Sequence, residues 1–248
     1  METFGWFHSL FEKRPANKQD GNPLAGKPLR YLIGADNKVE QGVEGEITEV
    51  NYGGWPARKG VSIAYCNLFD EYNSGRLGPY LKSSDTAKEY AEGQIDPRGP
   101  GWAKNLNEQF ERRKRQGFEF IELDNPDAYD INDVIGAIDL AASRGLKVVA
   151  KNPFNFGKWD HCCDYVQHSN IFGAIVENGE TDPDDMDELR RASSKRDLPV
   201  WFVAFNDSEG GMEWARKCAE TIKTKGYREM RVTYSSRGEY GNSIDIGG

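Results

Sequence analysis

Residues 117–127 read GFEFIELDNPD, and this stretch decides how the rest of the chain is interpreted. Its first half is apolar and rich in strand-forming residues, and Asn125-Pro126 would stop a strand. Side chains alternate along a strand, so Glu122 and Asp124 share one face and the leucine between them takes the other. The stretch therefore predicts a buried β-strand that ends in two acids.

A pair of carboxylates at the carboxyl end of a parallel strand lies where α/β proteins keep their active sites. A structural interpretation stays open beside this one, because one acid can cap the next helix while the other pairs with a basic residue. The Asn-Pro-Asp that follows makes the acid pair a stronger functional candidate than a single strand-end acid would be.

The chain alternates strand-like and helix-like segments on both sides of this stretch. With Phe118–Asp124, the predicted strands are Leu29–Ile33, Ile47–Asn51, Val61–Asn67, Lys147–Lys151, Ala174–Glu177, Val200–Phe205 and Met230–Tyr234. Amphipathic patterns predict helices at Trp102–Gln116, Ile131–Arg144, Asp184–Arg196 and Met212–Lys225. The basic run Arg112–Arg115 is expected to be a solvated helix end, where cations meet the negative end of the dipole.

Strands that alternate with helices in this number predict an α/β fold, a (β/α)8 or TIM barrel. A doubly wound open sheet is the alternative, but no glycine-rich phosphate loop follows the first strand. The segment Ser235–Gly248 is short and glycine-rich, so we expect the last helix of the barrel to be missing.

The first residues could replace that helix. We expect residues 1–28 to form an amino-terminal helix and linker, followed by the barrel at 29–248. Phe4, Phe7 and Phe11 give the helix an apolar face that would pack on the barrel. Docking of a partner on the same face is the open alternative.

Composition limits the partners. A net charge of −8 argues against nucleic acid, and no apolar run is long enough to span a membrane. The start of the chain lacks an export signal, so we expect a soluble protein that is cytoplasmic or exported by another route. Cys162-Cys163 and the nearby histidines have no matching ligand pair, so neither a metal nor a cofactor is expected. The oligomeric state does not follow from the sequence.

The carboxyl ends of barrel strands converge at one mouth, so residues there are considered together. Nearly every predicted strand ends in a polar group, and turn-forming asparagine explains only part of this pattern. The candidates are Tyr65, Asn67, Glu122, Asp124, Lys151, Asn152, Glu177, Asn206 and Tyr234.

These motifs resemble the endo-α-1,4-polygalactosaminidase family of glycoside hydrolases. The stretch 117–127 is similar to the family's Gly-Phe-Asp-Gly-Val-Glu-Pro-Asp-Asn-Val-Asp, and Lys151-Asn152 is similar to its Lys-Asn strand end. Residues 175–178 resemble the segment with the family's second catalytic acid, and 198–202 resemble its Lys-Pro-Val-Phe. The likeness covers roughly residues 60–235.

Three departures from the family pattern weaken the inference about substrate but not about fold. The family usually has a cysteine shortly after the second acid, where this chain has Asn178-Gly179. Its last motif carries an acid near the position of Asn206, and its glycine turn and acid after the third strand are replaced here around Asn67.

The resemblance implies a hydrolase that cleaves an amino-sugar or related polysaccharide with two carboxyl groups, Asp124 and Glu177. Glu122 would raise the pKa of Asp124 by like-charge repulsion, and Lys151 would stabilise an ionised acid. Glu122 and Lys151 would also bind the carbohydrate substrate. The other candidates for this role are Tyr65, Asn67, Asn152, Asn206 and Tyr234.

Two other functions remain open. The first is a barrel that binds carbohydrate or a protein without turning it over, which the departures around Asn67, Asn178 and Asn206 keep possible. The second is a metal-assisted lyase or aldolase that uses Glu122, Asp124 and Lys151. Since no predicted strand ends in histidine, a magnesium site would suit this second function better than a transition-metal site.

Overall fold

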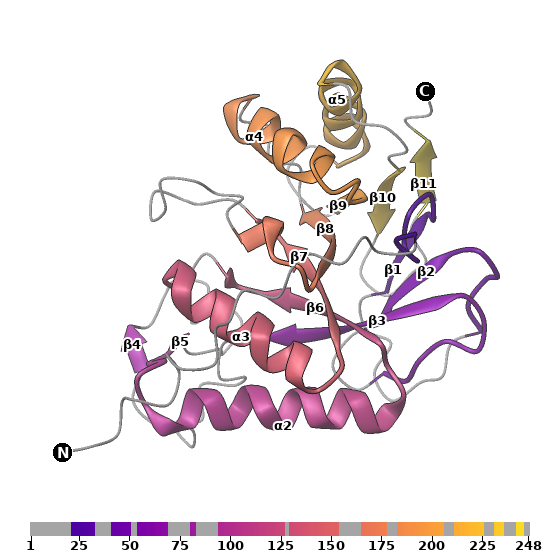
Figure 1. The fold of residues 1–248 in the computed structure, drawn as a ribbon. Helices are drawn as coiled ribbons and strands as arrows, with labels where there is room; N and C mark the ends of the chain where they lie inside the picture. Colours follow the sequence, from indigo (N-terminus) through magenta and orange to yellow (C-terminus); the bar gives the residue numbers. More distant parts are fainter. Residues whose placement is uncertain are drawn as a thin grey trace.

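The computed structural model describes residues 21–32, 41–50, 54–68, 80–82, 94–126, 129–153, 165–177, 183–205, 211–225, 231–235 and 242–245. One nine-stranded sheet curves through these residues (Figure 1). Its order is β1 (Leu29–Leu32), β2 (Ile47–Val50), β3 (Val61–Asn67), β6 (Phe120–Asp124), β7 (Lys147–Lys151), β8 (Ile171–Glu177), β9 (Val200–Phe205), β10 (Arg231–Ser235) and β11 (Asn242–Asp245).

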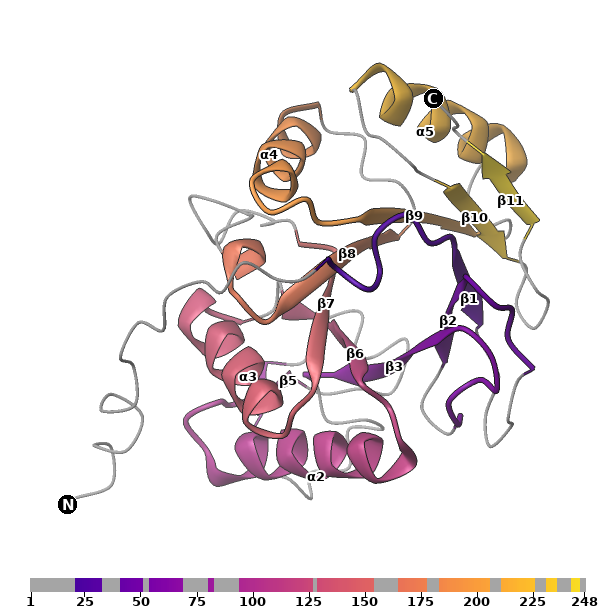
Figure 2. The ribbon, with the colours of Figure 1, turned by 45° about the vertical axis from the view of Figure 1, so that its right-hand side comes forward.

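The sheet forms a nearly closed barrel. Every neighbouring pair of strands from β1 to β10 is parallel. The first and last parallel strands, β1 and β10, come close to one another, as both views of the ribbon show (Figure 2). The predicted barrel is therefore confirmed, and the alternative of an open sheet is wrong.

Helices cover the outside of the barrel between successive strands. They are α2 (Pro100–Gln116), α3 (Ile131–Ser143), α4 (Pro183–Ser194) and α5 (Gly211–Thr224), with a 3-10 turn, η3 (Tyr165–Gln167), before β8. Helix α2 begins at a proline and ends at Gly117, whose φ of 96° is in the left-handed region that favours glycine. Its basic end is solvated as expected except for Arg113, which is fully buried.

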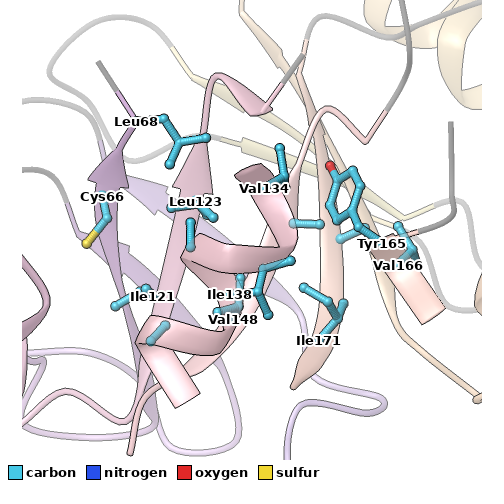
Figure 3. Close-up of a cluster of buried hydrophobic side chains, with 14 of the residues drawn as sticks. Cys66, Leu68, Ile121, Leu123, Val134, Ile138, Val148, Tyr165, Val166 and Ile171 are labelled. Atoms are coloured by element: carbon cyan, nitrogen blue, oxygen red, sulfur yellow. The ribbon is translucent and has the colours of Figure 1, made fainter. Parts of the chain in front are cut away.

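The outer core lies between the strands and these helices. Figure 3 shows Ile121 and Leu123 of β6 packed with Val134 and Ile138 of α3. Alternate residues of the same strands form a second, inner core. It contains Leu29, Ile47, Ile63, Phe120, Val149, Ile175, Trp201 and Val203. Because the two cores use alternate positions, the side chains that follow the inner core by two residues also point into the barrel.

A short segment before β1 closes the amino end of the barrel. Leu24 is fully buried in the inner core. Asn22 Nδ2 donates to the carbonyl of Phe172 at 2.7 Å, and Trp201 Nε1 donates to the carbonyl of Lys27 at 2.9 Å. The segment 21–28, which was expected to be a linker, thus plugs the barrel in the structure.

The remaining elements are small and were not expected from the sequence. Strands β4 (Tyr80–Lys82) and β5 (Gln94–Ile95) form a separate antiparallel pair. After β10, the described residues form β11, which is antiparallel to β10, where we expected an irregular tail in place of the last helix. Residues 1–20, with the predicted aromatic helix, lie outside the described residues. No helix in the part of the chain that is described could span a membrane.

Candidate active site

Four acids and one lysine follow the inner core toward the carboxyl mouth of the barrel. Glu49 lies two residues after Ile47 on β2, and Glu122 and Asp124 lie two and four residues after Phe120 on β6. Strands β7 and β8 contribute Lys151 and Glu177 by the same alternation, after Val149 and Ile175. Acids are rarely buried in a barrel interior without a function, so this group is the candidate active site.

Lys151 connects the acids. Its side chain is 4% exposed, and Nζ lies 3.0 Å from Glu177 Oε1 and 3.5 Å from Asp124 Oδ2. Because both oxygens are close to one nitrogen, they cannot be more than about 6.5 Å apart. The sequence expectation that Asp124, Lys151 and Glu177 meet at the mouth therefore agrees with the structure. Two carboxyl oxygens this close are compatible with a two-carboxylate mechanism.

Tyr65 holds Asp124 from the neighbouring strand. Its hydroxyl donates to Asp124 Oδ2 at 2.5 Å, and its ring lies 5.1 Å from Lys151 Nζ. Asp124 Oδ1 accepts a hydrogen bond from the backbone N–H of Asn125 at 2.9 Å. Asn125 has a φ of 59°, a left-handed conformation that asparagine tolerates better than most residues. Both carboxylate oxygens of Asp124 are thus oriented by the protein.

Two predicted substrate-binding asparagines make structural contacts at this mouth. Asn67 is fully buried, and its Oδ1 accepts a hydrogen bond from Asn125 Nδ2 at 2.8 Å. Gln109 of α2 bonds to the backbone N–H and carbonyl of Asn67 at 3.0 and 2.8 Å. Asn152 Oδ1 accepts from the backbone N–H of Glu177 at 2.7 Å. These amides fix the strand ends that carry the acids, and their contact with a substrate stays a prediction.

Glu122 and Glu49 lie deeper than Asp124 and Glu177. Glu122 is fully buried, with Lys151 Nζ 3.9 Å from Oε1. Burial raises the pKa of Glu122 well above its usual range, and Lys151 opposes this shift.

Glu49 was missed at the sequence level. It is 2% exposed, and burial raises its pKa to about 8, against the opposing effect of Lys151. The available signal was its position two residues after Ile47 on a predicted strand, which puts both on one face. Glu49 was not predicted because it does not stand at the end of its strand.

Other predicted residues are not tested by the geometry. Asn206 and Asn178 lie outside the described residues, and Tyr234 belongs to β10, where only its backbone is described. Within the described ranges, no group of three His, Cys, Asp or Glu side chains is spaced to hold a metal ion.

Comparison with solved structures identifies proteins of the same shape. Ega3 from Aspergillus fumigatus, solved in complex with galactosamine, matches with a TM-score of 0.65 at 12% identity, over 91% of this chain and 98% of Ega3. The glycoside hydrolase domain of PelA from Pseudomonas aeruginosa matches with a TM-score of 0.56 at 15% identity, over 87% of this chain and 98% of that domain. This chain shares their fold.

Sequence comparisons add nothing to this result. No protein-family profile matches the chain. No curated protein matches it either. At identities of 12% and 15%, the likeness to Ega3 and PelA establishes the barrel fold and leaves the reaction to be argued from the site.

Proposed function

We propose that this protein is a glycoside hydrolase that cleaves an amino-sugar-containing polysaccharide with Asp124 and Glu177 as its two catalytic carboxyl groups. The observation that carries the proposal is the meeting of both acids at one lysine, from strands β6 and β8 of a barrel. Glycoside hydrolysis needs two carboxyls on either side of the scissile bond, one as acid and the other as nucleophile or base.

The spacing of the pair supports a retaining mechanism. Retaining enzymes hold their carboxyls about 5–5.5 Å apart, whereas inverting enzymes leave about 6.5–9.5 Å for a water molecule. The limit of about 6.5 Å between the oxygens of Asp124 and Glu177 that face Lys151 reaches only the lower edge of the inverting range. We therefore propose that one acid attacks the anomeric carbon while the other protonates the leaving oxygen.

The charge of the site supports a substrate that carries amines. The two proposed catalytic acids face Lys151 at the mouth of the barrel, and the whole chain has a net charge of −8. Such a surface attracts a cationic sugar and repels an anionic one. The shape shared with Ega3, which was solved with galactosamine, agrees with this choice.

Release of reducing ends from galactosamine and glucosamine polymers tests the proposal. We expect the wild-type protein to release fragments, and Asp124→Asn and Glu177→Gln each to lower the rate by about 10²–10⁴ or more. Both substitutions preserve shape, so the circular dichroism spectrum should not change. Glu108→Gln is the matched control, because Glu108 is an exposed acid on α2, outside the barrel.

Two outcomes would contradict the proposal. If the wild-type protein binds such a polymer but releases no fragments, the chain is a carbohydrate-binding barrel and not a hydrolase. If fragments are released but both substitutions leave the rate unchanged, the catalytic groups are not Asp124 and Glu177.

A further inference from the structure

Two acids in the barrel have no direct role in the proposed reaction. Glu49 and Glu122 are 2% and 0% exposed, beneath the catalytic pair. Among the described residues, Glu49 Oε1 and both carboxylate oxygens of Glu122 accept no hydrogen bond. A buried carboxylate without hydrogen bonds is costly unless a cation neutralises it.

The cations near these acids are few. The positive charge of Lys151 lowers the pKa of both acids, and that of Arg113 lowers the pKa of Glu49. The negative charges of Asp124 and Glu177 raise the pKa of both acids. Arg113 belongs to α2 outside the barrel, and its guanidinium donates to the carbonyl of Tyr65 at 3.0 Å. Lys151 Nζ is 3.9 Å from Glu122, farther than it is from either catalytic acid. One lysine cannot neutralise four carboxylates.

We propose that Glu49 and Glu122 are positioning residues that stay protonated beneath Asp124 and Glu177, and thereby leave Lys151 to the catalytic pair. Burial raises the pKa of both acids, that of Glu49 to about 8, in agreement with this arrangement. When Glu49 loses its proton, the new charge competes with Asp124 and Glu177 for Lys151. The effect on turnover rests on the proposed function, but the protons can be detected without a substrate.

The pH dependence of stability follows from these protons. An acid whose folded pKa is raised stabilises the folded state fully below its unfolded pKa, and this contribution is lost as the pH rises to the folded pKa. We therefore expect the urea midpoint of the wild-type protein to fall between about pH 5 and pH 8. Glutamine resembles a protonated glutamate in shape and charge. Glu49→Gln should therefore match the wild type near pH 5 and exceed its midpoint near pH 8.

Equilibrium unfolding in urea from pH 5 to pH 9 measures this difference, with Glu108→Gln as an exposed control that should follow the wild-type curve. If Glu49 is ionised and paired with Lys151 instead, Glu49→Gln will be less stable than the wild type throughout this range. That result would overturn the proposal.

A second measurement does not depend on whether a variant folds. In the wild-type protein with 13C-labelled glutamate, one carboxyl signal should titrate near pH 8, and a second should titrate well above the usual range of glutamate. Titration of every glutamate signal below about pH 6 would overturn the proposal.

The pH profile of turnover tests the positioning role. We expect the alkaline limb of kcat/KM to move upward by about one pH unit in Glu49→Gln. An unchanged limb in an active enzyme refutes the positioning role alone. A protein that shows both titrations but cleaves no polymer refutes the proposed function and leaves the buried protons established.

Discussion

Lys151 is the residue on which the polar interior of the barrel depends. It is 3% exposed and lies within 3.9 Å of Glu122, Asp124 and Glu177. Removing one partner from a buried ion pair typically costs about 3–5 kcal/mol, because the remaining charge is left without compensation. We expect Lys151→Met to lower the free energy of unfolding by about this amount at pH 7.

The loss in Lys151→Met should shrink as the pH falls. A buried acid that has lost its cation takes up a proton more readily, so less charge is left uncompensated in the variant as the pH falls toward 4.5. Urea unfolding of both proteins at pH 7 and pH 4.5 measures the difference. A loss of equal size at both pH values would show that Lys151 contributes by packing and not by charge.

Tyr65 offers a second test at a single side chain. Its hydroxyl donates to Asp124 Oδ2 at 2.5 Å, and a hydrogen bond to a charged group contributes about 1.5–3 kcal/mol. If Asp124 is catalytic, Tyr65→Phe should lower kcat/KM by about 10–100-fold, because Asp124 then loses one of the contacts that orient it. The ring over Lys151 is retained. Wild-type kinetics in this variant would show that the hydroxyl does not assist Asp124.

At the scale of elements, the plug before β1 is the least expected part of the barrel. Leu24 is fully buried against strand residues of the inner core, although it lies in a segment without strand or helix pattern. Truncating a buried leucine costs about 2–5 kcal/mol, since the cavity fills only partly. We expect Leu24→Ala to lower the free energy of unfolding by this amount.

Thermal and urea unfolding of Leu24→Ala provide the measurement. Val43→Ala is the matched control, because Val43 is 37% exposed and should change stability by no more than about 0.5 kcal/mol. Equal effects of the two substitutions would mean that residues 21–28 do not close the barrel in solution.

Local pattern predicted the main strands well and the small ones poorly. Strands β3, β7 and β9 begin and end at the predicted residues, because each is a run of apolar and β-branched residues between breakers. Strands β4, β5 and β11 depend on antiparallel partners, and each is only two to four residues long. Nothing local distinguishes such segments from loops.

The same limit applies to the candidate site. Asp124, Lys151 and Glu177 were predicted because they end long, clear strands, and parallel strands bring such ends together. Glu49 was not, because only the closed barrel shows how completely it is buried. Arg113 was expected in solvent with the rest of its basic run, but its guanidinium reaches the carbonyl of Tyr65. Burial of this kind arises from tertiary packing, which a helix pattern cannot show.

At the scale of the whole molecule, the barrel brings together acids that are far apart in the sequence. The curvature of the sheet places β2, β6 and β8 around one interior, so their acids lie around Lys151 of β7. If the close spacing of Asp124 and Glu177 reflects a retaining mechanism, the first product should keep the anomeric configuration of the substrate.

Proton NMR of a galactosamine polymer during digestion tests the central claim most directly, because it detects a broken bond and its configuration together. We predict new reducing-end signals with the configuration of the substrate in the first minutes, before mutarotation, and none with Glu177→Gln. New ends of opposite configuration would contradict the retaining mechanism. A polymer that binds the wild-type protein and gains no reducing ends would contradict the assignment of this barrel as a glycoside hydrolase.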